Sequence, residues 1–168
     1  MSTSRTVVSL AAALLMLASA TPLRAQTQPS DSAAVVAVVQ RLFDAMATKD
    51  TALARSLIMP STRFVSMLSD TTPATPRAQA DTMFLRSLVT GSQKLLERMW
   101  APVVHVQGPL AILWAPYDFH VDGRFSHCGI DTATLVRGRT GWMLTSLAYT
   151  VQRRGCAPSP LGAPKGGE

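Results

Sequence analysis

The segment 111–150 constrains the fold most, because apolar residues recur at every second position along most of its length. Two short turn sequences interrupt it, Asp122-Gly123 and Gly138–Gly141, and Asp-Gly is one of the strongest hairpin signals. Alternation between such turns is typical of half-buried antiparallel strands. We therefore predict strands at about 110–121, 125–137 and 142–152, preceded by one at about 94–106.

Two helices are predicted near the start of the folded part. The first begins at Ser30 or Asp31, both good N-caps, and carries apolar residues at three- and four-residue spacing until Lys49. Asp50 caps a second, short helix that carries Leu53, Leu57 and Ile58, and Pro60 ends it.

A third helix is predicted after a short strand at 63–68 and a loop at 69–76. Thr75 is its expected cap, Pro76 its first residue, and Gly91 its end. The expected buried stripe is Met83, Phe84, Leu88 and Val89. Three helices followed by a sheet predict an α+β fold, in which three N-terminal helices pack on a curved antiparallel sheet. Such a sheet forms a cone with a central cavity, which is a natural ligand pocket.

The N-terminal residues 1–25 have the layout of a secretory signal peptide: an early Arg5, an apolar run from Val7 to Ala18 and a small-residue end. An uncleaved anchor is the alternative. We expect cleavage after Ala25, a folded domain at 26–156 and a disordered tail at 157–168. The mature protein would be periplasmic or secreted, without membrane attachment.

The charge pattern argues against nucleic acid as a partner. The formal net charge of +6 falls to +4 without residues 1–25, and the basic residues are scattered. The chain has no phosphate-binding glycine motif, so we expect no nucleotide or other cofactor. Asp118, His120, His127 and Asp131 lack the close spacing of metal ligands, so we expect no metal.

Cys128 and Cys156 both lie in the part expected to be exported, where disulfides form. Only one pairing is possible, and it would attach the C-terminal tail to a strand. Two unpaired thiols are the alternative.

Side chains alternate along strands, so the turns also predict two faces. Counting from the turns puts Asp118 opposite His127, Trp114 opposite Asp131, Asp131 opposite Ala148 and Arg137 opposite Trp142. We predict that the face toward the cavity carries Trp114, Asp118, His127, Asp131, Trp142 and Ser146. The other face, more uniformly apolar, carries Leu113, Tyr117, Phe119, Cys128, Ile130, Leu147 and Tyr149; it would serve as a dimer surface or back a second layer.

Three residues are candidates for catalysis: His127, Asp131 and Asp118. A carboxylate beside an imidazole fixes its tautomer and can form an acid–base pair. Asp131 could act as a base or accept a hydrogen bond from a ligand. The alternatives are a structural cross-strand pair and a buried Asp131 that bonds to Ser146 or the backbone. The expected ligand-binding residues are Trp114, His127, Asp131, Trp142 and Ser146.

The pattern W-A-P-Y-x-F-x-x-D-G at Trp114–Gly123, S-H-C-G at Ser126–Gly129, Gly141-Trp142 and Gly155-Cys156 resembles the nuclear transport factor 2-like (NTF2-like, cystatin-like cone) superfamily. It is most similar to the exported lumazine-binding-like and polyketide-cyclase-like branch, over residues 31–156. The resemblance implies a cone with an interior cavity, often in a dimer. Some members are isomerases, dehydratases or cyclases, and others only bind.

The expected function is exported binding of a small apolar molecule, by a homodimer. The first alternative is a cofactor-independent lyase or isomerase that uses a His/Asp pair in the pocket. The second is a dimerising interaction module. A steroid-isomerase-like site would need tyrosines beside its base, and the predicted faces separate Tyr117 and Tyr149 from Asp131.

Overall fold

The computed structural model describes residues 30–70 and 72–164, and within these ranges it contains three helices and a seven-stranded sheet. The helices are α1 (Asp31–Thr48), α2 (Thr51–Leu57) and α3 (Asp81–Thr90). The strands are β1 (Ile58–Leu68), β2 (Thr75–Ala80), β3 (Leu95–Met99), β4 (Val103–Gln107), β5 (Leu110–Val121), β6 (Arg124–Gly138) and β7 (Gly141–Val151). The predicted signal peptide lies outside the described residues. None of the described helices has the length and apolar character needed to cross a membrane.

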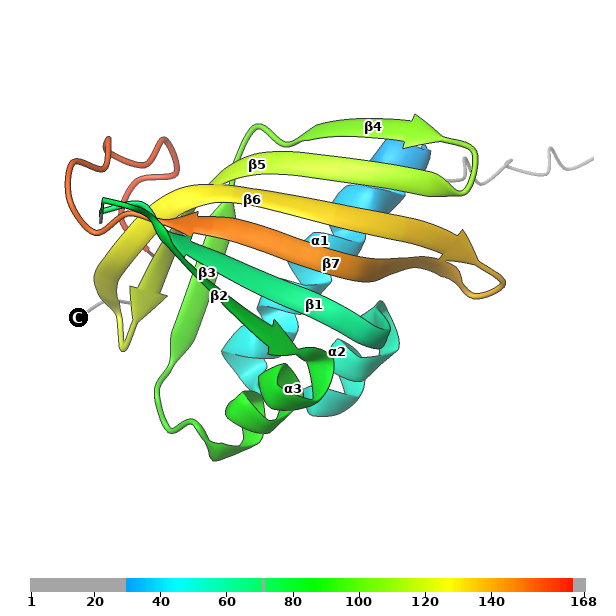
Figure 1. The fold of residues 1–168 in the computed structure, drawn as a ribbon, viewed down its shortest axis with the longest axis horizontal. Helices are drawn as coiled ribbons and strands as arrows, with labels where there is room; N and C mark the ends of the chain where they lie inside the picture. The colour runs from blue at the N-terminus through cyan, green and yellow to red at the C-terminus, as the bar shows by residue number, and fades with distance from the viewer. Residues whose placement is uncertain (1–29, 71, 165–168) are drawn as a thin grey trace, which may run out of the picture.

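The strands form one curved sheet in the order β2-β1-β7-β6-β5-β3, and β4 also pairs with β5 (Figure 1). Helix α1 crosses one side of the sheet, and α2 and α3 lie beside β1 (Figure 1). The predicted antiparallel sheet is correct except at one place, because β1 runs parallel to β7. The sheet is therefore mixed, and the α+β class is confirmed.

The first two helices begin where their capping residues predict. The Ser30 hydroxyl accepts a hydrogen bond from the Ala33 amide, and the Asp50 carboxylate accepts one from the Leu53 amide. Helix α1 ends at Lys49, whose left-handed backbone has a φ of 58° and whose ammonium group donates to the Gly91 carbonyl. Strand β1 begins at Ile58 directly after α2, so Ile58 belongs to the strand and not to the helix.

The third helix differs from its prediction in both place and orientation. Residues 75–80 form β2, which pairs with β1, so the helix begins at Asp81 and not at Pro76. It follows two strands, and therefore the three helices are not all N-terminal to the sheet. Phe84, Leu85 and Leu88 are buried, whereas Met83 and Val89 are exposed. Gly91 ends the helix as predicted.

A bulge in β6 changes the predicted face of the central strands. The Asp122-Gly123 turn forms, but Ser126 is an extra residue beyond it, so Phe119 rather than Asp118 lies opposite His127. A shift of one residue turns a strand over relative to its partner. His127 therefore shares a face with Phe119, and the predicted Asp118–His127 pair is wrong.

A second bulge, at Thr145 in β7, changes the other side of β6. Arg137 pairs with Trp142 as predicted, but beyond Thr145 the register shifts so that Asp131 lies opposite Tyr149 rather than Ala148. On β5, Asp131 lies opposite Ala115 rather than Trp114. Both predicted partners of Asp131 are therefore wrong.

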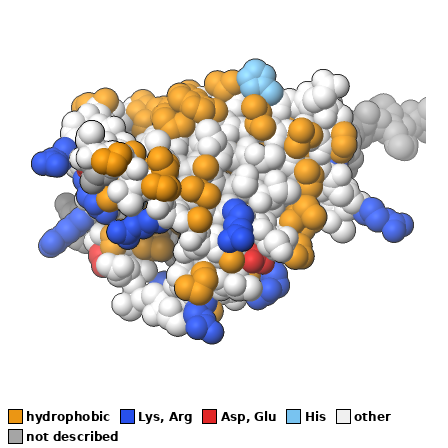
Figure 2. All heavy atoms as spheres, viewed as in Figure 1, with side chains coloured by type: hydrophobic (Ala, Val, Ile, Leu, Met, Phe, Trp, Pro, Cys, Tyr) orange, Lys and Arg blue, Asp and Glu red, His pale blue; other side chains and the backbone are white. Residues whose placement is uncertain are grey.

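The apolar core lies between α1 and the inner face of the sheet. Val35, Val39 and Leu42 of α1 are buried there, as are Leu113 of β5 and Leu135 of β6. The outer face is different: Val103, Leu110, Ile112 and Trp114 are each about half exposed on β4 and β5. Figure 2 shows hydrophobic side chains spread over the upper part of the molecule, where these strands lie in Figure 1.

Candidate functional site

A cavity of about 340 Å³ opens between the inner face of the sheet and helices α1 and α3. Its walls are mostly apolar and aromatic, as in many small-molecule sites. The apolar lining residues are Met46, Phe64, Leu68, Phe84, Leu88, Leu95, Phe119, Leu147 and Val151. The polar lining residues are Ser66, Arg77, Gln79, Ser87, Glu97, Tyr117, His127, Tyr149 and Arg153.

Two carboxyl groups lie together at the buried side of this cavity. Glu97 of β3 lines it and is 8% exposed, and Asp131 of β6 is fully buried. Within the described part of the chain no backbone N–H, amide or hydroxyl group donates to either Asp131 oxygen, and its hydrogen-bonding partner is the Glu97 carboxyl. Two ionised carboxylates only accept hydrogen bonds, so this bond requires that one of the pair is protonated.

The electrostatics of the pair favour the shared proton. Burial raises the pKa of Glu97 well above its usual value, and the charge of Asp131 and the hydrogen bond with it raise it further. Burial also raises the pKa of Asp131, although the bond to Glu97 acts in the opposite direction. Like charges this close cannot both ionise easily, so the two groups titrate as one unit. The pair thus holds a proton between its two carboxyl groups, in an otherwise apolar wall.

Two tyrosines flank the acid pair on the same face of the sheet. The Tyr117 hydroxyl donates to the Thr150 carbonyl at 2.7 Å, and Tyr149 hydrogen-bonds Ser66. Burial raises the pKa of both phenols, and the nearby Glu97 raises both further. The predicted separation of Tyr117 and Tyr149 from Asp131 is therefore wrong.

Gly129 makes room for this arrangement. A Cβ atom there would meet the Thr150 carbonyl oxygen at 2.0 Å and the Tyr117 ring at 2.8 Å. Side chains do not tolerate such distances, so the Tyr117 ring and β7 approach β6 closely only because this residue has no side chain. The glycine of the S-H-C-G motif thus has a packing role.

His127 lies on the cavity wall, as predicted, but away from Asp118. Its ring stacks on Phe119 with centroids 4.9 Å apart, and its Nδ1 lies 3.0 Å from the Ser126 hydroxyl. Burial lowers the pKa of His127 to about 4, and the charge of Arg153 contributes to the decrease. The imidazole is therefore neutral at physiological pH and can accept or donate one hydrogen bond.

Comparisons with known proteins identify the fold. No family model and no curated protein sequence matches the chain. An NTF2-like superfamily protein from Salmonella enterica matches in structure with a TM-score of 0.58 and 17% identity, over 74% of this chain and 94% of that one. An NTF2-like protein with a cystatin-like fold from Novosphingobium aromaticivorans matches with a TM-score of 0.59 and 12% identity, over 75% and 84%.

This chain has the NTF2-like fold. A third structure with this fold, from Streptomyces avermitilis, is provisionally described as a dehydratase of the NTF2-like family. It matches with a TM-score of 0.55 and 13% identity, over 70% of this chain and 92% of that one. Similarity at this level establishes the fold and leaves the activity open.

The outer side of the NTF2-like sheet holds a second ionisable cluster. The Asp118 carboxylate accepts two hydrogen bonds from Arg98, at 2.8 and 2.6 Å, and lies 3.3 Å from His120 Nε2. Burial would raise the pKa of Asp118, but the hydrogen bonds from Arg98 and Ser159 and the charges of Arg98 and His120 lower it overall.

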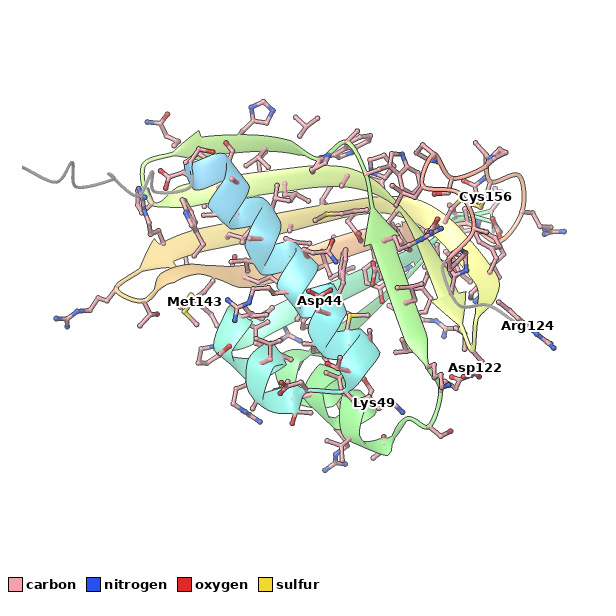
Figure 3. All side chains as sticks on the ribbon, turned by 180° about the vertical axis from the view of Figure 1, so that it is seen from behind. Asp44, Lys49, Asp122, Arg124, Met143 and Cys156 are labelled. Carbon is pink, nitrogen blue, oxygen red and sulfur yellow. A yellow bond between two sulfur atoms is a disulfide. The ribbon has the colours of Figure 1, made fainter. Side chains whose placement is uncertain are left out.

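The C-terminal segment covers this outer cluster. Cys128 and Cys156 form the predicted disulfide, and Arg98 also donates to the Gly162 carbonyl. Figure 3 shows Cys156 at the end of the molecule that also carries Asp122 and Arg124 of the β5–β6 hairpin. The expected disorder after Cys156 stays a prediction, and residues 165–168 lie outside the described residues.

The predicted site residues are divided among three places. His127 lines the cavity, and Asp131 on the same face of the sheet hydrogen-bonds Glu97, which also lines it. The structure therefore places His127 and Asp131 at one site. Trp114 is 46% exposed, and neither it nor Ser146 lines the cavity, because the bulges turn His127 and Asp131 to the face opposite both residues. Trp142 is buried at the opposite end, in a separate hollow with α1 and α2, under the Arg137 guanidinium. The predicted cavity face is therefore wrong for Trp114, Asp118 and Ser146.

Sequence reasoning missed Glu97, which lines the cavity and is buried. The segment 94–106 reads as one strand, but Trp100 and Pro102 divide it into β3 and β4. Proline seldom occurs within a central strand, so Pro102 was the available signal. A short β3 paired with the end of β5 would have placed Glu97 opposite Phe119, on the cavity face. Among the described residues, no group of three or more His, Cys, Asp or Glu could hold a metal.

Proposed function

We propose that this NTF2-like chain binds a small, mostly apolar molecule that carries a carbonyl or hydroxyl group. The observation that carries the proposal is the Glu97–Asp131 pair at the wall of an otherwise apolar cavity. The protonated carboxyl group of a buried acid pair can donate a hydrogen bond to a ligand carbonyl or hydroxyl oxygen. Aromatic side chains on both sides, Phe84 and Phe119, would contact the ligand body.

A neutral fluorescent probe tests this proposal. N-phenyl-1-naphthylamine should become fluorescent in the cavity of the wild-type protein. Ser87→Trp, on the α3 side of the cavity, should remove at least about ten-fold of the affinity by filling the space. Arg86→Trp is the matched control, because Arg86 is the neighbouring exposed residue and does not line the cavity. Equal binding by both variants, or none by the wild type, would contradict the proposal.

An enzymatic role is the second candidate, and the same acid pair favours it. Carboxyl groups with raised pKa values in a cleft are typical general acids and bases. A cofactor-independent lyase or isomerase of this kind would move a proton between Glu97 and a bound ligand. His127, neutral and 3.0 Å from Ser126, could orient the ligand.

Deuterium exchange separates the enzyme from the binding protein. The protein should catalyse exchange of the methyl protons of 2-acetylnaphthalene in deuterated water, measured by mass spectrometry, if Glu97 acts as a base. Glu97→Gln should remove the exchange while binding persists. If the exchange rate with the wild-type protein equals the rate in buffer, the enzymatic role is contradicted and only the binding role remains.

Export and self-association belong to the same proposal. The disulfide and the predicted signal peptide support a periplasmic or secreted location, which fractionation of cells expressing the full chain would test.

The half-exposed Leu110, Ile112 and Trp114 on the outer face support a homodimer. The face that carries Tyr149, predicted as a possible dimer surface, lines the cavity instead, so Trp114→Asp on the outer face is the substitution that tests the dimer. Membership of the lumazine-binding-like branch stays a prediction.

A further inference from the structure

We propose that the ligand is an organic anion, whose carboxylate is held at the mouth of the cavity by Arg77 and Arg153. This inference rests on the proposed function, because it assigns the chemical class of the molecule that enters the same cavity. It concerns the mouth, whereas the proposed hydrogen bond to the acid pair concerns the buried wall.

The two arginines come from separate elements and meet at one cavity. Arg77 lies on β2 opposite Ser66, and Arg153 follows the end of β7. Both line the cavity and both are exposed, so they lie where it opens to solvent. Figure 2 shows Lys and Arg side chains gathered at the end of the molecule where β1 and β7 end in Figure 1.

Neither guanidinium is neutralised by a carboxylate within the described ranges. The ion pairs there join Arg98 and His120 to Asp118, and Arg137 to Asp31. The Asp70 carboxylate accepts the backbone N–H of Arg153 at 2.8 Å, and the ion pairs of the described residues do not include one between Asp70 and the Arg153 guanidinium. The guanidinium groups are thus available, and their planar donors match a carboxylate.

The mouth and the buried wall of the cavity therefore favour different chemical groups on the ligand. An acid pair that shares one proton carries one negative charge, so an anionic ligand group would be unfavourable beside it. A cationic ligand group would be repelled at the mouth. A molecule with an apolar body, a neutral oxygen at its inner end and a carboxylate at its outer end satisfies both ends.

Three naphthalene probes of nearly equal shape test the inference on the folded, disulfide-intact protein. We would measure affinities for 2-naphthoate, 2-naphthamide and 2-naphthylmethylammonium by isothermal titration calorimetry at low and high salt. Naphthoate should bind about ten-fold more tightly than naphthamide at low salt, with the difference reduced at high salt because exposed charges are screened.

The arginine variants assign that preference to residues. Arg77→Gln and Arg153→Gln should each weaken naphthoate binding about three-fold, as expected for exposed ion pairs, and the double variant should remove the preference. Naphthamide affinity should not change. Arg86→Gln, which removes an exposed charge outside the cavity, should leave all three affinities unchanged.

Three results would overturn the inference. Equal affinity for naphthoate and naphthamide, insensitive to the arginine variants, would contradict the anion while leaving the cavity-binding function intact. Tightest binding of the ammonium probe, lost in Glu97→Gln, would show that the acid pair selects a cation. If no probe binds and N-phenyl-1-naphthylamine also fails to bind, the proposed function fails together with this inference.

Discussion

Glu97 and Arg98 are neighbours in the chain, yet they belong to two clusters with opposite properties on the two sides of the sheet. On the inner side, Glu97 meets Asp131, without a cation, and burial raises both pKa values. On the outer side, Arg98 binds Asp118 through two hydrogen bonds, and the pKa of Asp118 is lowered. Asp118 and Asp131 have the same side chain, and their pKa values shift in opposite directions because only Asp118 faces a guanidinium.

The difference shows which cluster stabilises the fold and which is available to a ligand. A buried carboxylate with a bidentate arginine has its hydrogen-bonding capacity satisfied, and the C-terminal segment closes over it. A buried acid pair that borders a cavity has capacity left over, at a cost in stability. Residues arranged against stability beside a cavity are typical of functional sites. Perturbation of each cluster in turn tests this division.

The largest expected effect comes from releasing the segment that covers the outer cluster. The Cys128–Cys156 bond closes a loop with a sequence separation of 28. Loss of the bond in the double variant C128S/C156S should lower the free energy of unfolding by about 3.5 kcal/mol in the chain-entropy account. Urea unfolding of the wild type and the double variant measures this. Probe binding by the folded variant should persist, since the cavity lies on the other side of the sheet.

The second effect compares one carboxylate from each cluster. Asp118→Ala leaves the largely buried Arg98 without its partner and should cost about 2 to 3 kcal/mol. Asp131→Asn removes a carboxylate that no cation stabilises, and its cost should be below about 1 kcal/mol. Denaturant unfolding at neutral pH would give both values. Equal losses would contradict the distinction between the clusters.

The sequence predicts most of the fold but only part of the site, because short local signals determine turns and caps but not the bulges that set the faces of the strands. Hairpin turns and capping residues are determined by short stretches, so the ends of α1, α2 and the three long strands are close to their predictions. The bulges at Ser126 and Thr145 have no comparable signal, and each one turns over the residues beyond it. His127 and Asp131 were therefore predicted in the cavity, but with Asp118 and Trp114 rather than with Glu97 and Tyr149.

The smallest effect, and the most specific, is the dependence of stability on pH. For Glu97 the folded-state pKa lies above the unfolded value, so the folded protein keeps a proton that the unfolded chain releases. Stability from this group is fully present below the unfolded pKa and decreases as pH rises through the folded pKa. For Asp118 the folded pKa is lowered, so its contribution is present above the unfolded pKa and is lost as pH falls.

The two clusters should therefore shape opposite limbs of one stability profile. In the wild type, the free energy of unfolding should decrease as pH rises above the usual carboxyl pKa of about 4, and Glu97→Gln should reduce that decrease. Asp118→Asn should leave this limb unchanged and alter the limb below about pH 4. Urea unfolding over this pH range measures both. If Glu97→Gln left the alkaline limb unchanged, the acid pair would not hold its proton, and the hydrogen bond proposed for the ligand would lose its donor.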